Sequence, residues 1–279
     1  MILHQRRVLA PEVDAELQGY QRDLDALPTY AEKVAAARRE FKNKNKPTNQ
    51  AFCEVKRTLE EMTTGAARCM YCEDSLASEI EHYRPKALYP ERTFDWFNYL
   101  YACGSCNRNK GDRFAVFSSE LGEVLDVTRR RNAPIAPPAA GAAVLLDPRH
   151  DDASRLLRLD LVDTFFFVPL PALGAAEDQR ARYTIETLKL NERDALVAQR
   201  REYFHAYAAS LEAYQSCRDR GASAEELAQR RAQIQHMGHP TVWLEMRRQH
   251  GLHPRLRALF AASPEALEWD SHACATMRG

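Results

Sequence analysis

Apolar residues recur at helical spacing over the first 65 positions of the chain. Pro28 interrupts the first run, and a second, charged helix is expected over residues 30–41. A third helix is expected to open at Pro47, with Thr48 or Asn49 as its cap. The first run follows intervals of four and three, the spacing of one helix face: Val13, Leu17, Tyr20, Leu24 and Leu27.

The helical period is lost between residues 66 and 118, where turn signals, aromatic residues and paired cysteines replace it. Residues 132–141 contain three prolines and several alanines, which predicts a surface loop. Residues 157–168 alternate between apolar and polar and then become solidly apolar, a pattern that indicates a small hairpin.

From residue 177 onward the pattern is helical again. Ser263 before Pro264 favours a further helix start, with the serine as its cap. We therefore expect a mainly α chain with three parts: a helical region over 1–65, a small module over 66–118, and a loop, hairpin and helices over 119–279. One stripe is expected to be core or interface: Phe204, Tyr207, Leu211 and Tyr214.

Composition narrows the class of protein. The chain has 279 residues, 45% of them hydrophobic, and no apolar run approaches the eighteen residues of a membrane span. The N-terminus lacks the apolar segment of a secretion signal, so a cytoplasmic location is expected. The net charge of the whole chain is zero, which gives no support to a nucleic-acid partner. A protein can nevertheless bind nucleic acid through one basic face, so the local charge has to be considered as well. Residues 83–113 carry six basic residues against three acidic ones.

Four of the seven cysteines form two tight pairs, Cys69 with Cys72 and Cys103 with Cys106. Each short turn can present two thiolates to one ion, and two turns complete a tetrahedral zinc site. Because sulfur fills all four positions, the zinc is expected to be structural. The alternatives are four unrelated buried thiols, or a redox pair without the βαβ context of thioredoxins.

Several other residues are expected to have structural roles only. His150 is expected in a polar turn. The isolated cysteines are expected to be small buried hydrophobes: Cys53, Cys217 and Cys274. The aromatic residues of the module are expected in its core rather than as platforms for stacking bases: Phe94, Trp96 and Phe97.

The cysteine pairs enclose a carboxylate beside a histidine, Glu81-His82, then Asn98, with Asn107 just after the last cysteine. With this constellation, the segment 69–114 resembles HNH endonucleases. That resemblance implies a ββα-metal fold, in which two strands, a loop and a short helix surround one catalytic divalent ion.

The similarity extends over roughly residues 50 to 200. Over this range the chain resembles the PtuB-type HNH subunits of Septu antiphage systems and their retron-associated relatives. The resemblance lies in five sequence segments: CMYCE, IEHYRPK, FDWFNYLYACGSCNRNKGDRF, LLDPRHDD and YTIETLKLN. This implies a defence nuclease that works beside a PtuA-type ATPase subunit. The helical regions on either side are then expected to be docking surfaces, unless they simply complete one globular core.

Phosphodiester hydrolysis needs a base for water and a cation for the phosphoryl oxygens. His82 is suited to be the base, because the ordinary pKa of an imidazole lies near neutral pH and its neutral form can accept a proton. Glu81 and Asn107 offer oxygen ligands for catalytic Mg²⁺ or Mn²⁺. By resemblance, Asn98 orients the imidazole and Asn107 takes the place of the last histidine of the motif. Neighbours in a strand point to opposite faces, so Glu81 and His82 can share a site only where the strand bends or ends, as Pro85 favours.

Basic residues around these positions are candidate phosphate contacts, with a solvated surface charge as the alternative for each. Asn107 and Lys110 are three apart on the expected helix, so both can face one side, and Gly111 is expected to end it. DNA is the favoured substrate over RNA. An RNA-directed nuclease and a zinc module that binds without cutting remain open. The candidate phosphate contacts are Arg84, Lys86, Arg108 and Lys110.

Overall fold

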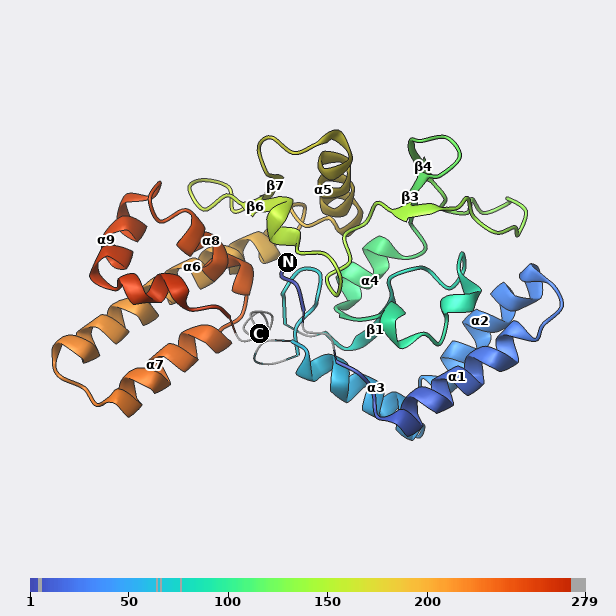
Figure 1. The fold of residues 1–279 in the computed structure, drawn as a ribbon, viewed down its shortest axis with the longest axis horizontal. Helices are drawn as coiled ribbons and strands as arrows, with labels where there is room; N and C mark the ends of the chain where they lie inside the picture. Colours follow the sequence, from blue (N-terminus) through green and yellow to red (C-terminus); the bar gives the residue numbers. More distant parts are fainter. Residues whose placement is uncertain (5–6, 64, 66, 76, 272–279) are drawn as a thin grey trace.

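The computed structural model describes residues 1–4, 7–63, 65, 67–75 and 77–271. About half of the chain is helical and its sheets are small. In Figure 1 the helices α1 (Pro11–Asp25) and α2 (Tyr30–Lys44) lie at one end of the long axis, and α3 (Gln50–Glu61) leads back toward the centre. Four C-terminal helices form the other end: α6 (Asp194–Asp219), α7 (Ala224–His236), α8 (Pro240–Arg248) and α9 (Pro254–Ala262).

The three helices expected in the N-terminal region are confirmed. The side chain of Asn49 caps α3 by accepting a hydrogen bond from the backbone N of Phe52 at 3.3 Å. Thr29 and Glu32 form a capping box at the start of α2, which gives the chain a fixed turn after α1. The helix α1 contacts both α2 and α3, and α3 contacts β2 in the middle of the molecule.

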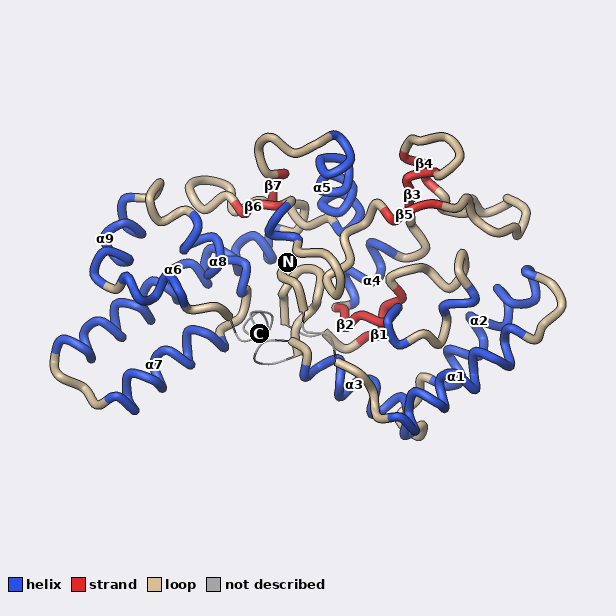
Figure 2. Tube along the Cα trace, in the orientation of Figure 1, coloured by secondary structure: helices blue, strands red, loops and turns tan. Residues whose placement is uncertain are grey.

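The described residues form three small sheets, whose strands are drawn red in Figure 2. Strands β1 (Glu79–His82) and β2 (Tyr99–Ala102) are antiparallel, with Glu79 opposite Ala102 and His82 opposite Tyr99. The helix α4 (Gly104–Lys110) follows β2 directly. Two short 3₁₀ turns, η1 (Pro90–Arg92) and η2 (Trp96–Asn98), lie in the connection between the two strands.

The second sheet has the order β4-β3-β5 and was not expected: β3 (Ala115–Ser118), β4 (Val124–Asp126) and β5 (Gly141–Ala143). Residues 132–140 form the expected loop that leads into β5. The small hairpin predicted over 157–168 is confirmed as β6 (Leu157–Leu159) and β7 (Phe167–Pro169). The short turn η3 (Ala153–Arg155) lies just before β6, and the helix α5 (Ala175–Leu188) lies just after β7.

The C-terminal region is helical, as its pattern predicts. The aromatic and leucine stripe of α6 is buried: Phe204, Tyr207, Leu211 and Tyr214. The expected start at Ser263 is wrong in its details. Pro264–Glu268 forms a short 3₁₀ turn, η4, and the Ser263 hydroxyl accepts from Arg218 instead of capping the turn. No helix among the described residues is long and apolar enough to cross a membrane.

Two expectations about buried residues are corrected. Phe97 is 44% exposed, whereas Phe94 and Trp96 are buried as expected. Trp96 and Asn98, its neighbours in the turn η2, face the interior, which leaves the Phe97 ring on the outer side. Cys53 is exposed because it lies beside the apolar face of α3, where its thiol contacts the Pro47 carbonyl. Cys217 is buried as expected, and Cys274 lies outside the described residues.

Candidate functional site

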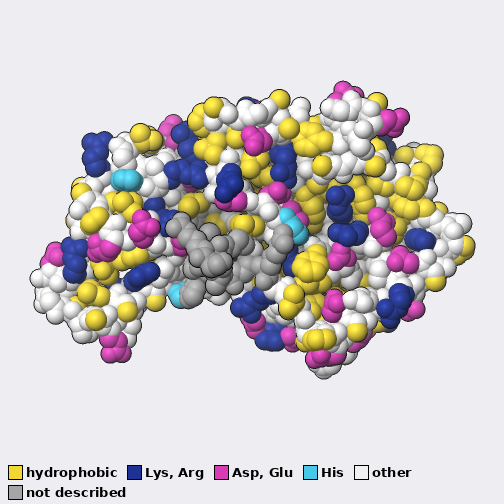
Figure 3. All heavy atoms as spheres, in the orientation of Figure 1, with side chains coloured by type: hydrophobic (Ala, Val, Ile, Leu, Met, Phe, Trp, Pro, Cys, Tyr) yellow, Lys and Arg dark blue, Asp and Glu magenta, His cyan; other side chains and the backbone are white. Residues whose placement is uncertain are grey.

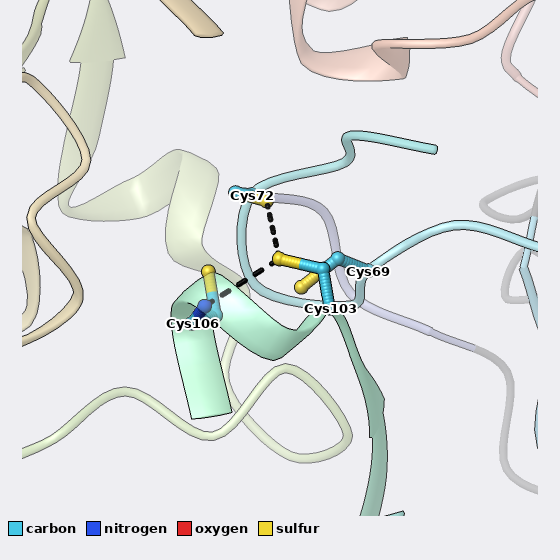
Figure 4. A group of neighbouring side chains, drawn as sticks. All are labelled: Cys69, Cys72, Cys103 and Cys106. Carbon is cyan, nitrogen blue, oxygen red and sulfur yellow. Dashed lines mark hydrogen bonds between the residues drawn. The ribbon is translucent and has the colours of Figure 1, made fainter. Parts of the chain in front are cut away.

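The four paired cysteines converge. Cys69 and Cys72 lie in the turn before β1, Cys103 caps α4, and Cys106 lies in the first turn of that helix. Figure 4 shows their side chains around one point, and the four sulfurs lie within 4.8 Å of one another. The Sγ atoms of Cys72 and Cys103 are 3.7 Å apart.

This donor set fits a tetrahedral metal site. Zinc–sulfur bonds of about 2.3 Å place the sulfurs of such a site roughly 3.8 Å apart. The four buried cysteines can therefore hold a metal such as zinc. Within the described ranges, no other group of three or more His, Cys, Asp or Glu side chains comes close enough to hold an ion.

A side chain from the C-terminal region reaches this site. Arg193, the N-cap residue of α6, donates to the Sγ of Cys106 at 3.4 Å and to that of Cys103 at 3.9 Å. Donors of this kind orient metal ligands and offset the charge of their thiolates. Sequence reasoning missed Arg193, because 87 positions separate it from Cys106 and no local pattern connects them.

On one face of β1, Glu81 forms an ion pair with Lys110 of α4, with 2.5 Å between Oε1 and Nζ. The Lys110 ammonium also donates to the carbonyl oxygen of His82 at 2.7 Å. Both side chains are buried, and burial raises the pKa of the Glu81 carboxyl although the Lys110 charge opposes this. The pair joins the strand to the helix without exposed charge.

His82 lies on the opposite face of β1, against the rings of Phe41 (4.3 Å between centroids) and Tyr99 (5.2 Å). Its Nε2 is 3.0 Å from the Thr93 carbonyl oxygen. Since a carbonyl only accepts, Nε2 carries the proton and Nδ1 keeps its lone pair. Burial, reinforced by the Lys86 charge, lowers the pKa of His82 well below its usual value, so the imidazole is neutral.

The strand ends at His82, but the structure does not bring the Glu81 and His82 side chains to one face. Alternation along β1 separates them, as it does in any regular strand. A further acidic residue, Glu79, accepts a hydrogen bond from the side-chain amide of Asn107. Sequence reasoning missed Glu79, although its position two residues before Glu81 places both carboxylates on the face toward α4.

Asn98 organises the connection between β1 and β2. Its side-chain Nδ2 donates to the carbonyl oxygens of Arg84 (3.0 Å) and Arg92 (2.8 Å), and its Oδ1 accepts from the backbone N of Arg84 (2.7 Å). These bonds go to the backbone rather than to the His82 imidazole. Because Thr93 follows Arg92, Asn98 fixes the stretch of chain whose carbonyl holds His82.

The four candidate phosphate contacts differ in access. Arg108 is exposed, whereas Lys110 is buried and its ammonium is engaged by Glu81. The Lys86 ammonium lies 5.1 Å from the Phe41 ring centroid, and burial lowers the pKa of this lysine. Arg84 is half-buried, with its guanidinium 4.9 Å from the Tyr89 ring centroid.

The predicted end of α4 at Gly111 and the predicted polar turn at His150 are both present in the structure. Gly111 ends the helix with a φ of 49°, and its backbone N donates to the Asn107 carbonyl. This is a conformation that favours glycine. The His150 ring lies in a polar turn, with Nδ1 2.9 Å from the Asp147 carboxylate.

Comparison with known proteins gives one partial relationship. No protein-family model matches the chain. The Septu protein PtuB of Bacillus thuringiensis is 39% identical over 62 residues, which cover 20% of this chain and 23% of that protein. The similarity thus spans less than a quarter of the relative's length, and it relates part of this chain to Septu proteins.

Proposed function

We propose that this chain is an HNH-type, metal-dependent nuclease that serves in antiphage defence. The observation that carries the proposal is the order β1–β2–α4 around His82, with the four cysteines bracketing the unit. This is the arrangement of elements expected for a ββα-metal module. The partial similarity to a Septu protein supports the same reading.

His82 is the proposed general base. The bond from its Nε2 to Thr93 leaves the Nδ1 lone pair for a proton from water, and the depressed pKa keeps the imidazole neutral. The side chain is 3% exposed, so a substrate has to displace groups near it, such as the Lys86 ammonium beside Phe41. Asn98 is a positioning residue that acts through the backbone at Arg92 and Thr93.

Glu81 and Asn107 are the proposed ligands of Mg²⁺ or Mn²⁺, with Glu79 as a further oxygen donor on the same face. Such ions are commonly held through one or two carboxylates together with substrate phosphate. When bound, the ion neutralises charge on the phosphoryl oxygens. Glu81 has to exchange its Lys110 partner for this role, because the pair now satisfies its Oε1. Zinc at the four cysteines is proposed to be structural.

The substrate is proposed to be DNA, with RNA such as tRNA as the alternative, and the proposed partner is a PtuA-type ATPase subunit. Arg84, Lys86 and Arg108 remain proposed phosphate contacts, and Lys110 joins them only if its ion pair opens. In Figure 3, basic and acidic side chains are interspersed on the face shown. Local cations near the module are therefore expected to matter more than a large basic surface.

A second candidate is a zinc-stabilised module that binds nucleic acid or a partner without cutting. The specific observation in its favour is that His82 is buried and that Glu81 is paired with Lys110. Both His82 and Glu81 therefore contribute to the packing of the fold, whether or not they take part in catalysis. The residues that define the site are the same in the two proposals, so only a cleavage assay distinguishes them.

The decisive assay incubates the purified chain, alone and with a PtuA-type ATPase, with plasmid DNA and with total RNA. Reactions contain Mg²⁺, Mn²⁺ or no added divalent ion. We expect divalent-dependent cleavage of DNA. Cleavage of RNA but not of DNA would show that RNA is the substrate. Binding without cleavage under every condition would favour the non-catalytic module.

A further inference from the structure

A cavity of about 390 Å³ opens beside Asn98. Its walls come from the β1–β2 connection, from β3 and β5, and from the turn at residues 147–151 together with α5. The volume lies within the range of small-ligand sites. Several segments of the chain therefore build one concave surface next to Asn98, a residue of the proposed active site.

The acidic groups of this cavity already have partners. Asp147 lies 2.9 Å from the His150 ring nitrogen, and Asp151 pairs with Arg180 at 2.6 Å. Arg84 also lines the cavity, and it has no carboxylate partner among the described side chains. An arginine without a matching acid leaves positive charge on the wall, which favours an anionic ligand.

The cationic groups are held in place before any ligand binds. The Asn98 amide bonds the backbones of both Arg84 and Arg92, and both side chains line the cavity. The Arg92 guanidinium is also held by the Asp95 carboxylate, with 3.1 Å between Nε and Oδ2, and a bound phosphate has to share the guanidinium with this partner. The Arg84 guanidinium is also positioned over two rings, 4.9 Å from the Tyr89 centroid and 5.5 Å from that of Phe114. Preorganised donors of this kind bind phosphate with little loss of side-chain freedom.

An aromatic ring completes the wall. Phe97 lines the cavity and is 44% exposed, whereas its neighbours in the turn η2, Trp96 and Asn98, are buried. Phe117 and the small residues Ala142 and Ala143 extend the apolar part of the surface. Exposed aromatic rings beside cations are typical of sites that stack a nucleobase.

We propose that this cavity binds a single nucleotide, with its base against Phe97 and its phosphate at Arg84 and Arg92. An unpaired nucleotide of a strand and a free mononucleotide share this chemistry. The strand is the favoured source, and in that case the inference rests on the proposed nuclease function. Asn98 then couples the bound nucleotide to the backbone that holds His82.

Binding of a labelled oligothymidylate of twelve nucleotides to the protein is measured by fluorescence anisotropy without added divalent ions. Unlabelled thymidine monophosphate serves as the competitor. Phe97→Ala is expected to weaken binding roughly 5- to 100-fold. Arg84→Gln and Arg92→Gln are each expected to lower the slope of log affinity against log salt by about one. Phe166→Ala and Arg255→Gln, at an exposed ring and an exposed arginine elsewhere, are the matched controls. Arg84→Lys keeps the charge and checks for misfolding.

The outcomes separate this inference from the nuclease proposal. No cleavage occurs without divalent ions, so binding is measured apart from the nuclease activity, and the wild type, Phe166→Ala and Arg255→Gln should bind the oligonucleotide equally. Displacement by the monophosphate identifies a free nucleotide as a ligand, and resistance to it identifies the strand. Binding by the three cavity variants at the level of the controls, or no binding of either ligand by the wild type, would overturn the inference. Cleavage could then still be intact.

Discussion

At the scale of single residues, the site depends on buried polar groups whose partners come from neighbouring elements. Lys110 has no exposed surface, yet its ammonium serves Glu81 and the His82 carbonyl at once. A buried charge of this kind is tolerated only with its partner in place. The exposed Arg108, two positions earlier on the same helix, has no such constraint. Two basic residues of one short helix therefore differ in role: Lys110 stabilises the fold, whereas Arg108 is accessible at the surface.

Lys110→Met should destabilise the fold by about 3–5 kcal/mol, because it leaves the Glu81 carboxylate buried without a counter-ion. The free energy of unfolding in urea measures this. Lys42→Met, at an exposed position of α2, should change it by less than about 0.5 kcal/mol. Adding Glu81→Gln to Lys110→Met should restore part of the loss. A Lys110→Met effect no larger than that of Lys42→Met would show that the pair does not hold β1 to α4.

At the scale of elements, the cysteine pairs and α6 depend on each other. The N-terminus of α6 supplies Arg193 to the sulfurs of Cys103 and Cys106, while those cysteines begin α4. The four-cysteine cluster, which can hold a metal such as zinc, thereby involves both the segment from Cys69 to Cys106 and the C-terminal helices. Helix starts such as Asn49 could be predicted from local sequence, because capping involves residues three positions apart. The Arg193 contact could not, since it depends on how distant elements pack.

Arg193→Gln should weaken zinc binding roughly 10- to 100-fold, the usual effect of removing a donor to metal ligands. The measurement is the rate at which a coloured chelator removes zinc from the purified protein. Arg193→Lys should lose less, because it keeps a positive charge near the thiolates. Arg255→Gln, at an exposed position of α9, serves as the control. Equal zinc release from the wild type and Arg193→Gln would contradict the role of this contact.

At the scale of the whole molecule, one cluster of buried apolar residues includes side chains from all three regions expected from the sequence, from Leu17 through Tyr99 to Trp269. Buried titratable groups therefore affect the stability of the whole chain. His239, at the start of α8, is 1% exposed, and burial lowers its pKa to about 3. The unfolded chain takes up this proton near pH 6.5, whereas the folded protein resists it.

Stability linked to His239 is present above pH 6.5 and is lost as the pH falls toward 3, because only the unfolded state binds the proton in this window. His239→Asn, which tolerates the positive φ at this position, should reduce the slope of unfolding free energy against pH by up to about 1.4 kcal/mol per pH unit. Urea titrations between pH 4 and 7 measure the slope. His205→Asn, at an exposed position of α6, should leave it unchanged, and an unchanged slope for His239→Asn would refute the assignment.

Much of the architecture follows from local patterns: the N-terminal helices, the β6–β7 hairpin and the convergence of the four cysteines. The exposure of Phe97 and the β4-β3-β5 sheet could not be predicted, because both depend on how segments pack rather than on their own periodicity. For the candidate site, the sequence predicts catalytic roles for His82 and Asn98, and these roles stay predictions. It could not show that the Asn98 amide bonds the backbone of Arg84 and Arg92 instead of the imidazole.

His82 is the proposed base of a divalent-dependent nuclease. The most direct measurement is the single-turnover cleavage rate of wild-type and His82→Ala proteins at equal zinc content and with equal thermal unfolding profiles. We expect cleavage by the wild type with Mg²⁺ or Mn²⁺ and a loss of about 10²- to 10⁴-fold in the variant. Cleavage by His82→Ala at the wild-type rate would contradict it.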